Sequence, residues 1–231
     1  MSNLTTYQEE DKYVIITLNN GKVNAISSDV INELNIYLDK AEALKKIVIL
    51  TGTTGMFSGG YDLKTMTNSP KDALALVTLG STLALRMLSF PMPIIVAATG
   101  HSLAKGAFLL LCADYRIGTE GDYKIGLNEV AIGMTMHNAG IAIAKARLAP
   151  VFFERSVNNA EVYNPSDAVN AGFLDTVVTP EATLPTAIKV AEMFSGLNKK
   201  AHAQTKLKLR KPYLEALKKA IALDKTELFK S

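Results

Sequence analysis

Cysteine is almost missing from this 231-residue sequence, which contains only Cys112. A single cysteine excludes an internal disulfide framework and fits a reducing compartment. It lies in the apolar run AFLLLCADYRI, which indicates a buried structural thiol rather than a nucleophile. No group of cysteine and histidine residues has the spacing of a zinc site, so we predict no metal.

An excess of one charge and long apolar runs are missing too. The 25 Lys and Arg against 22 Asp and Glu leave a net charge of +3, which does not indicate a strongly basic nucleic-acid-binding protein. No stretch reaches the roughly 20 apolar residues of a membrane span. The N-terminal sequence has no basic-then-apolar signal pattern. We therefore expect a cytoplasmic protein with no nucleic-acid partner and no membrane partner.

The hydrophobic pattern that is present predicts an α/β core. Strands are predicted where short segments are β-branched or wholly apolar: 4–10, 13–19, 46–52, 91–100, 113–119 and 123–126. Helices are predicted from apolar spacing and caps: 28–44, 70–89, 104–112 and 138–149. From about residue 160 the chain is predicted to be helical and increasingly basic. We divide it into a core, 1–160, and a helical C-terminal region, 161–231.

Two loops that follow buried strands are the candidates for a site. The first, in MFSGGYDLKTM (56–66), has two adjacent glycines, which allow a ligand to approach the backbone closely, and then Tyr61. The second, in PIIVAATGHSLAKGAFLLL (93–111), leads into a helix whose first N–H groups, that of Lys105 among them, are free. Two such N–H groups aimed at one point form an oxyanion hole, which stabilises a thioester carbonyl as it becomes an enolate.

A nucleophile elbow is an alternative interpretation of the second loop. GHSLA at 100–104 is close to the G-x-S-x-G sequence of serine hydrolases, although alanine replaces the last glycine. The partner histidine would have to be His137 or His202. No G-x-G-x-x-G or Walker sequence is present, so nicotinamide and nucleoside-triphosphate chemistry have no support.

Four segments in this order and spacing resemble the crotonase (enoyl-CoA hydratase/isomerase) superfamily. FSGGYDL at 57–63 resembles the family's F-S-A-G-A-D-L signature, and 93–117 resembles its glycine-rich second signature. KVNAI at 22–26 resembles the loop that lies against the CoA nucleotide, and GLNEVAIGM at 126–134 resembles the segment with a catalytic glutamate. The resemblance covers nearly the whole chain.

This resemblance implies the ClpP/crotonase-like fold, a spiral of ββα units in two nearly perpendicular sheets with a helical C-terminal region. It implies an acyl-CoA substrate, with coenzyme A entering as part of that substrate and no separate cofactor. It also implies a homotrimer or a dimer of trimers, in which residues 161–231 would be the trimerisation region.

Site roles follow from the same resemblance. The oxyanion donors would be the backbone N–H groups of Tyr61 and Lys105, and the catalytic carboxylate would be Glu129. Lys105 replaces the usual glycine, and we expect its ammonium to lie in solvent, the alternative being a place near a CoA phosphate. The substrate-binding residues implied are Val23, Ala25, Gly59, Gly60, Asp62, Leu63, Phe108 and His137.

Phe108 bears on the reaction. Family hydratases use two glutamates to position and activate water, and Phe108 occupies the place of one of them and cannot transfer a proton. One carboxylate still suffices to move a double bond, as in the similar mitochondrial 3,2-enoyl-CoA isomerase, because Glu129 can take a proton from C2 and return it to C4. An apolar Phe108 is also expected to raise the pKa of Glu129 toward neutrality. We favour an isomerase; the alternatives are a hydratase, a thioester hydrolase and a non-catalytic acyl-CoA-binding homologue.

The remaining charged residues are interpreted as structural or peripheral. Asp114 and Arg116 are expected to pair with each other. His101 is expected to be structural and His202 to lie on the surface. His137 is expected either to line the acyl pocket or to lie outside it.

Overall fold

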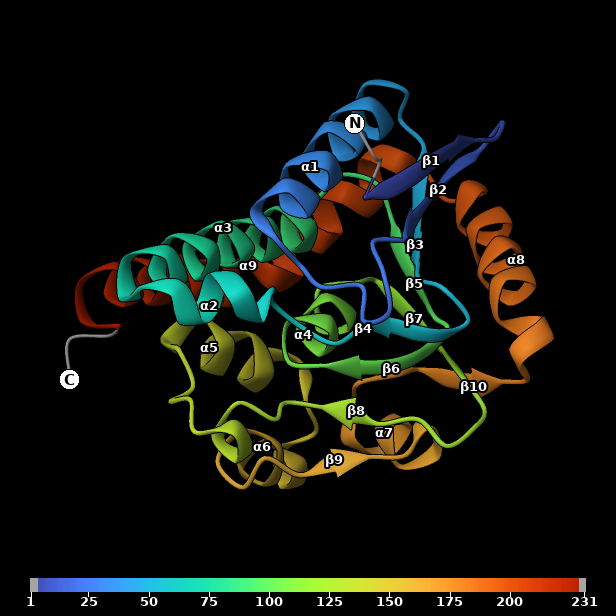
Figure 1. Cartoon of the computed structure of the whole chain (residues 1–231). Helices are drawn as coiled ribbons and strands as arrows, with labels where there is room; N and C mark the ends of the chain where they lie inside the picture. Colours follow the sequence, from blue (N-terminus) through green and yellow to red (C-terminus); the bar gives the residue numbers. More distant parts are fainter. Residues whose placement is uncertain (1–3, 229–231) are drawn as a thin grey trace.

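Two β-sheets form the centre of the computed structural model, which describes residues 4–228 (Figure 1). The larger sheet has the order β1-β2-β3-β5-β7-β10 and comprises β1 Thr5–Glu9, β2 Tyr13–Leu18, β3 Ile47–Thr51, β5 Ile94–Ala98, β7 Tyr115–Thr119 and β10 Thr176–Val178. The smaller sheet comprises β4 Gly55–Ser58, β6 Gly100–Leu103, β8 Ile125–Gly126 and β9 Val162–Tyr163. In the larger sheet only the β1–β2 pair is antiparallel, within the described chain.

Successive strands of the larger sheet lead directly into strands of the smaller one. β3 is followed by β4, β5 by β6 and β7 by β8, so the chain turns a corner between the sheets each time. At the β5–β6 corner a Cβ on Gly100 would lie 2.1 Å from the carbonyl carbon of Gly55, so only glycine fits. The predicted α/β fold with two sheets is confirmed.

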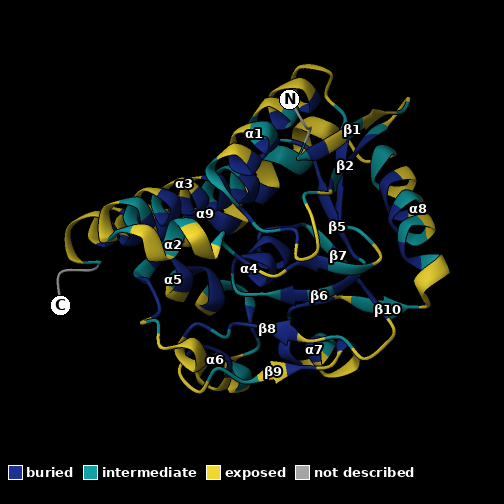
Figure 2. Cartoon of the chain, in the orientation of Figure 1, coloured by how far each residue is buried: buried dark blue, intermediate teal, exposed yellow. Residues whose placement is uncertain are grey.

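Helices cover both faces of the larger sheet. They are α1 Ser28–Ala43, α2 Leu63–Asn68, α3 Pro70–Ser89, α4 Lys105–Leu111, α5 Asn138–Arg147, α6 Pro150–Val157, α7 Pro165–Ala171, α8 Thr183–Ser195 and α9 Lys199–Glu227, with short 3-10 helices η1 Val130–Ile132 and η2 Pro180–Ala182. α8 packs on β3 and β5, whereas α1 packs with α3, and α9 runs along α3 and α5. Figure 2 shows that α4 and the central strands are buried, while α8 and α9 expose their outer faces.

α3 corrects one expectation about apolar runs. By length and composition this helix could cross a membrane, and it is the only such helix in the described chain. Half of its apolar window is buried in the fold, where the helix packs against α1 and α9. Its start agrees with the prediction, because Ser69 caps it by accepting a hydrogen bond from Asp72 N at 3.1 Å and Pro70 occupies the first position.

The C-terminal region is not wholly helical, contrary to expectation. β9 joins the smaller sheet beside β8, and β10 is the edge strand of the larger sheet beside β7. The segment from 161 to 178 therefore completes the core. Helix α8 and the 29-residue α9 follow it, as the pattern predicted for this region.

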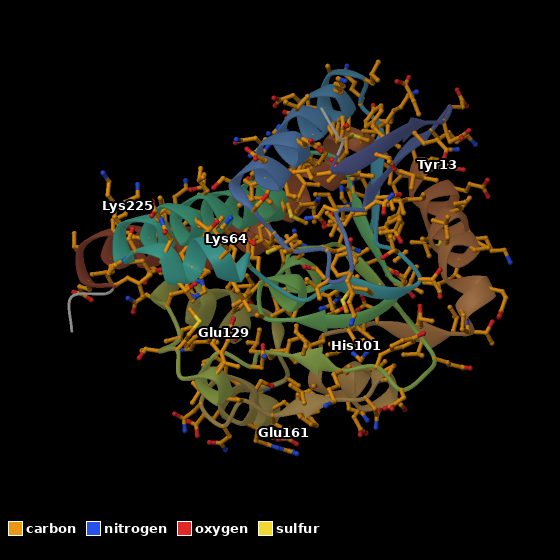
Figure 3. The ribbon with its side chains drawn as sticks, viewed as in Figure 1. Tyr13, Lys64, His101, Glu129, Glu161 and Lys225 are labelled. Carbon is orange, nitrogen blue, oxygen red and sulfur yellow. The ribbon has the colours of Figure 1, made fainter. Side chains whose placement is uncertain are left out.

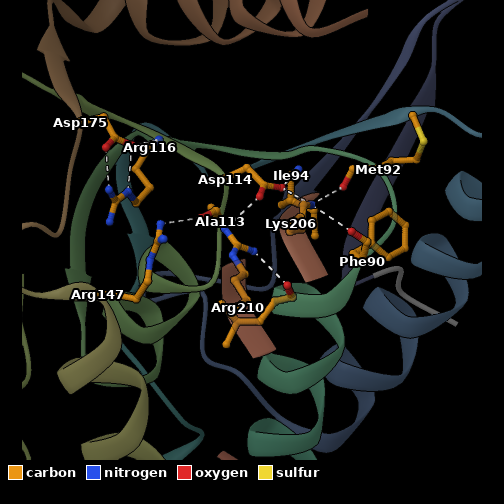
Figure 4. A network of polar contacts seen from close by, with 11 residues as sticks. Phe90, Met92, Ile94, Ala113, Asp114, Arg116, Arg147, Asp175, Lys206 and Arg210 are labelled. Atoms are coloured by element: carbon orange, nitrogen blue, oxygen red, sulfur yellow. Dashed lines mark hydrogen bonds and ion pairs between the residues drawn. The ribbon is translucent and has the colours of Figure 1, made fainter. Parts of the chain in front are cut away.

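Asp114 and Arg116 do not pair with each other, so that prediction was wrong. Asp114 binds Lys206 Nζ at 2.6 Å and Arg210 at 2.9 Å, both from α9 (Figure 4). Arg116 instead forms two hydrogen bonds with the carboxylate of Asp175, at 2.9 and 2.6 Å. The Asp114 group is nearly fully buried, so it fixes α9 to the start of β7.

Candidate active site

A cavity of about 330 Å³ lies between α2, α3 and the loop that joins β8 to α5. Its walls are mostly apolar, and its lining residues are Tyr61, Met66, Pro70, Val77, Glu129, Gly133, Met134, Thr135, His137 and Leu228. Two other hollows, of about 150 and 370 Å³, share Leu197 and His202 and contain none of the predicted site residues. The 330 Å³ cavity is therefore the candidate active site.

Glu129 presents a buried carboxyl group to this cavity. The side chain is only 8% exposed, and its Oε2 atom has no hydrogen-bond partner among residues 4–228. The loop is fixed by its own backbone, because Ile132 N and Met134 N both donate to Glu129 O, at 3.1 and 2.9 Å. Figure 3 shows Glu129 close to α2 and α5 and well away from His101.

Burial raises the pKa of the Glu129 carboxyl to about 7. A backbone hydrogen bond and the charge of Lys105 act in the opposite direction. The raised pKa agrees in direction with the sequence prediction, and its cause is burial of the carboxyl group; the contribution expected from Phe108 stays a prediction. A carboxyl group with a pKa near neutrality can both accept and return a proton at the pH of the cell.

The loop that contains Tyr61 is held by a short parallel β-bridge to Ile26, and the N–H of Tyr61 points away from this bridge. Ile26 N donates to Gly60 O at 2.8 Å, and Asp62 N donates to Ile26 O at 3.1 Å. In such a parallel bridge the intervening residue directs its own N–H to the opposite side. The Tyr61 N–H has no acceptor in the described part of the chain.

Lys105 supplies a second free N–H at the start of α4. Its neighbours Ala104 N and Phe108 N are bonded, to Gly126 O at 3.0 Å and to Ala104 O at 3.1 Å, but Lys105 N has no acceptor within residues 4–228. A Cβ on Gly60 would lie 3.5 Å from Lys105 N and 2.9 Å from Ala104 Cβ, and Gly60 has a φ of +111°. The two loops therefore meet at Gly60, as an oxyanion hole requires.

The side chain of Lys105 is buried, so the expectation that it lies in solvent was wrong. It is 2% exposed, and Nζ donates to Gly80 O of α3 at 2.6 Å. The ammonium also lies 5.7 Å from the centre of the Tyr61 ring. Burial lowers the pKa of Lys105 to about 8, against the opposing charges of Cys112 and Glu129.

His137 lies at the cavity wall, and Phe108 packs against it on the side away from the cavity. The Phe108 ring is buried and meets the His137 ring edge-on, with 5.5 Å between the ring centres. His137 lines the cavity, whereas Phe108 does not. Burial lowers the pKa of His137 to about 4, although the charge of Asp224 acts against this, so the imidazole is neutral at pH 7.

The other predicted binding residues form a rim beside the hole rather than the cavity wall. Gly59 N donates to Val23 O at 2.8 Å, which joins the 22–26 loop to the first glycine loop. Asp62 caps α2 through Thr65 N at 2.9 Å, the loop-fixing role expected for it. Two residues of the rim, Val23 and Leu63, are exposed, while Ala25 is half-buried.

Ser102 does not form a nucleophile elbow. It lies inside β6 and is fully buried, and its hydroxyl donates to Gly100 O at 3.1 Å. His101 accepts a hydrogen bond from Lys124 N at 3.0 Å, in keeping with a structural role. His202 was expected on the surface and is half-buried, in the first turn of α9.

Several site residues were missed from sequence. Met66 and Leu228 line the cavity from α2 and from the end of α9. Asp224 of α9 accepts hydrogen bonds from Asn138 N at 2.7 Å and Ala139 N at 2.9 Å, and so caps the helix that begins after His137. Helical periodicity could indicate that these residues are buried, but it carries no signal for which cavity they reach.

Comparison with known proteins agrees with this geometry. Residues 8–231 match the family described as enoyl-CoA hydratase/isomerase. A crystal structure of an enoyl-CoA hydratase/isomerase family protein from Pseudomonas syringae is 55% identical, with a TM-score of 0.97 over 99% of both chains.

Two more distant relatives are named for different reactions, one as an isomerase and one as a hydratase. An apo structure of an enoyl-CoA isomerase from Mycobacterium tuberculosis is 38% identical, with a TM-score of 0.94 over 99% of this chain and 100% of the other. The crotonyl-CoA hydratase of Syntrophomonas wolfei is 28% identical over 189 residues, which is 80% of this chain and 72% of the relative.

Proposed function

Because the chain belongs to the enoyl-CoA hydratase/isomerase family, we propose that it is an enoyl-CoA isomerase that moves a double bond with a single carboxylate. The observation that carries this proposal is the lining of the cavity. Glu129 is the only carboxylate among its described lining residues. The position that holds a second glutamate in similar hydratases is Phe108, which is buried behind His137.

The proposed reaction begins with a 3-enoyl-CoA whose thioester oxygen accepts hydrogen bonds from the N–H groups of Tyr61 and Lys105. Ionised Glu129 removes a proton from C2, and the electron pair moves into the carbonyl to give a dienolate. The same carboxyl group, now protonated, returns the proton to C4, and the double bond forms between C2 and C3. No atom is gained or lost, so no cofactor is needed beyond the CoA of the substrate.

The apolar cavity supports isomerisation rather than hydration. A hydratase must hold a water molecule between two groups that activate it, and this cavity offers one carboxyl group together with the neutral His137. Exclusion of water also protects the dienolate from side reactions. The relative from Mycobacterium tuberculosis is called an isomerase in one solved structure and a probable enoyl-CoA hydratase in another, so its name favours neither reaction.

A hydratase is the second candidate function. The crotonyl-CoA hydratase relative favours it, and so does the neutral ring of His137, which reaches the cavity and can hydrogen-bond to water. In that case His137 would replace the missing glutamate. The CoA moiety would lie along the rim formed by Val23, Ala25 and Leu63 in either function.

A paired assay distinguishes the candidates. The purified protein is given 3-hexenoyl-CoA and, separately, crotonyl-CoA, and the conjugated thioester is followed by absorbance. We expect conjugation of the first substrate and no hydration of the second, and Glu129→Gln should reduce isomerisation by roughly 1,000-fold or more while CoA binding persists. Hydration of crotonyl-CoA would favour the hydratase, full activity of Glu129→Gln would refute the role of Glu129, and no turnover with binding retained would indicate a non-catalytic homologue.

A further inference from the structure

Lys105 carries a buried charge that no carboxylate neutralises by direct contact. Within residues 4–228 it forms no salt bridge, whereas the other deeply buried lysine, Lys206, contacts Asp114 at 2.6 Å. Burying an ammonium without an ionic partner costs several kcal/mol. A side chain this flexible could reach solvent if burial served no purpose.

The ammonium of Lys105 joins three parts of the site. It donates to Gly80 O in α3 at 2.6 Å, it lies 5.7 Å from the Tyr61 ring centre, and its own backbone begins α4. The hydroxyl groups of Tyr61 and Ser81 lie next to each other in this region, and both are buried without a hydrogen-bond partner in the described chain. The interior here is poor in counter-ions, so the charge acts at longer range than it would in water.

The titratable groups around this charge come from several elements. They are Cys112 of α4, Tyr61 of the first glycine loop, Glu129 before η1, His137 before α5 and, through its charge on Tyr61 and His137, Asp224 of α9. Burial raises the pKa of both Cys112 and Tyr61, and so keeps them neutral. Asp224 is already engaged by the N-terminus of α5. Glu129 is thus the anion available to the ammonium before the substrate reacts.

We propose that the buried Lys105 ammonium is the fixed countercharge of the reaction, a positioning residue that favours the ionised form of Glu129 and then stabilises the enolate. When Glu129 takes the C2 proton it becomes neutral, and the negative charge moves to the thioester oxygen beside the N–H of the same Lys105. Because the ammonium and this N–H belong to one residue, the same cation acts on the negative charge before and after proton transfer. This inference rests on the proposed function, because it requires Glu129 as the base.

The pH profile of the wild-type enzyme gives the first test. Isomerisation of 3-hexenoyl-CoA, measured as kcat/KM between pH 5.5 and 9.5, should rise as Glu129 ionises, with its pKa about 7, and fall as Lys105 loses its proton, with its pKa about 8. A profile that stays flat from pH 7.5 to 9.5 would overturn the proposal. This test does not depend on the folding of any variant.

Lys105→Met gives the second test, because it keeps the backbone N–H and removes only the charge. We expect kcat to fall roughly 10- to 100-fold with little change in KM, an acid limb shifted to higher pH, and no alkaline limb. Lys189→Met, on the exposed face of α8, is the matched control and should behave as wild type. Thermal unfolding by circular dichroism verifies that each variant is folded.

Lys105→Gln separates the charge from the hydrogen bond to Gly80 O. Loss of activity in both variants supports the countercharge, and recovery of wild-type kcat and pH profile in Lys105→Gln would overturn it. Failure of the proposed function looks different, since Glu129→Gln would then remain active or hydration would replace isomerisation. An unaltered pH profile in Lys105→Met, with Glu129→Gln inactive, would overturn only the role of Lys105.

Discussion

Gly80→Ala is a sharp test of how α3 supports the oxyanion hole. A Cβ on Gly80 would lie 2.0 Å from the Tyr61 hydroxyl oxygen and 2.6 and 2.7 Å from two ring carbons. The phenol ring of Tyr61 has no room to stay where it is, and the backbone N–H of Tyr61 is the first of the two proposed oxyanion donors. The substitution therefore acts on the active site from a residue that does not itself line the cavity.

The expected magnitude follows from two opposing effects. Alanine in a helix interior stabilises by about 1 kcal/mol relative to glycine. Overpacking of a buried site costs about 1–3 kcal/mol, and contact with the rigid ring puts this case at the upper end. We expect a net loss of about 2 kcal/mol and a fall in Tm of about 4–8 °C. Displacement of the Tyr61 N–H should lower kcat by roughly 10- to 100-fold.

Isomerase kinetics and calorimetry on Gly80→Ala check this expectation, with Tyr61→Phe as the partner variant. The Tyr61 hydroxyl makes no hydrogen bond within the described chain, so Tyr61→Phe alone should leave stability nearly unchanged. In the double variant the closest contact is gone but those to the ring carbons persist, so Tm should recover in part. A Gly80→Ala protein that is more stable than wild type, with unchanged kcat, would refute the reasoning.

Two further predictions concern stability. Because the folded-state pKa of Glu129 is raised to about 7 from 4.5, the folded protein binds the proton more tightly than the unfolded chain, and stability should fall as pH rises between these values. Glu129→Gln should therefore be more stable than wild type at pH 8 by up to about 3 kcal/mol in urea unfolding, and equal stability at pH 8 would contradict the raised pKa. Asp114→Asn leaves Lys206 and Arg210 buried without their anion and should cost about 3 kcal/mol by the same measurement. An unchanged urea midpoint would show that the buried ion pairs contribute nothing.

Elements with local signals were predictable from sequence. The helix predicted at 70–89 is α3, Pro70–Ser89, because serine and proline mark its start. The helix predicted at 28–44 is α1, Ser28–Ala43, with Ser27 as its cap. The glycine loops and the family resemblance predict Tyr61, Lys105 and Glu129 as site residues from the sequence alone.

Features that depend on distant partners were not predictable. β9 and β10 are two and three residues long, and each is a strand only because β8 or β7 lies beside it. The burial of the Lys105 ammonium depends on a carbonyl 25 residues earlier in the chain, at Gly80. Neither the pairing of these short strands nor the burial of Lys105 produces a periodic or compositional pattern in the sequence.

Because α9 forms one side of the cavity, the cavity is completed late in the synthesis of the chain. Leu228 lines the cavity, and Asp224 caps α5 next to His137, so two parts of the site come from the last residues that the structure describes. Synthesis proceeds from the N-terminus, and both glycine loops leave the ribosome well before α9 does. The nascent chain can therefore bring its two glycine loops together while the cavity is still open on one side, and the cavity is completed only when α9 docks along α3 and α5.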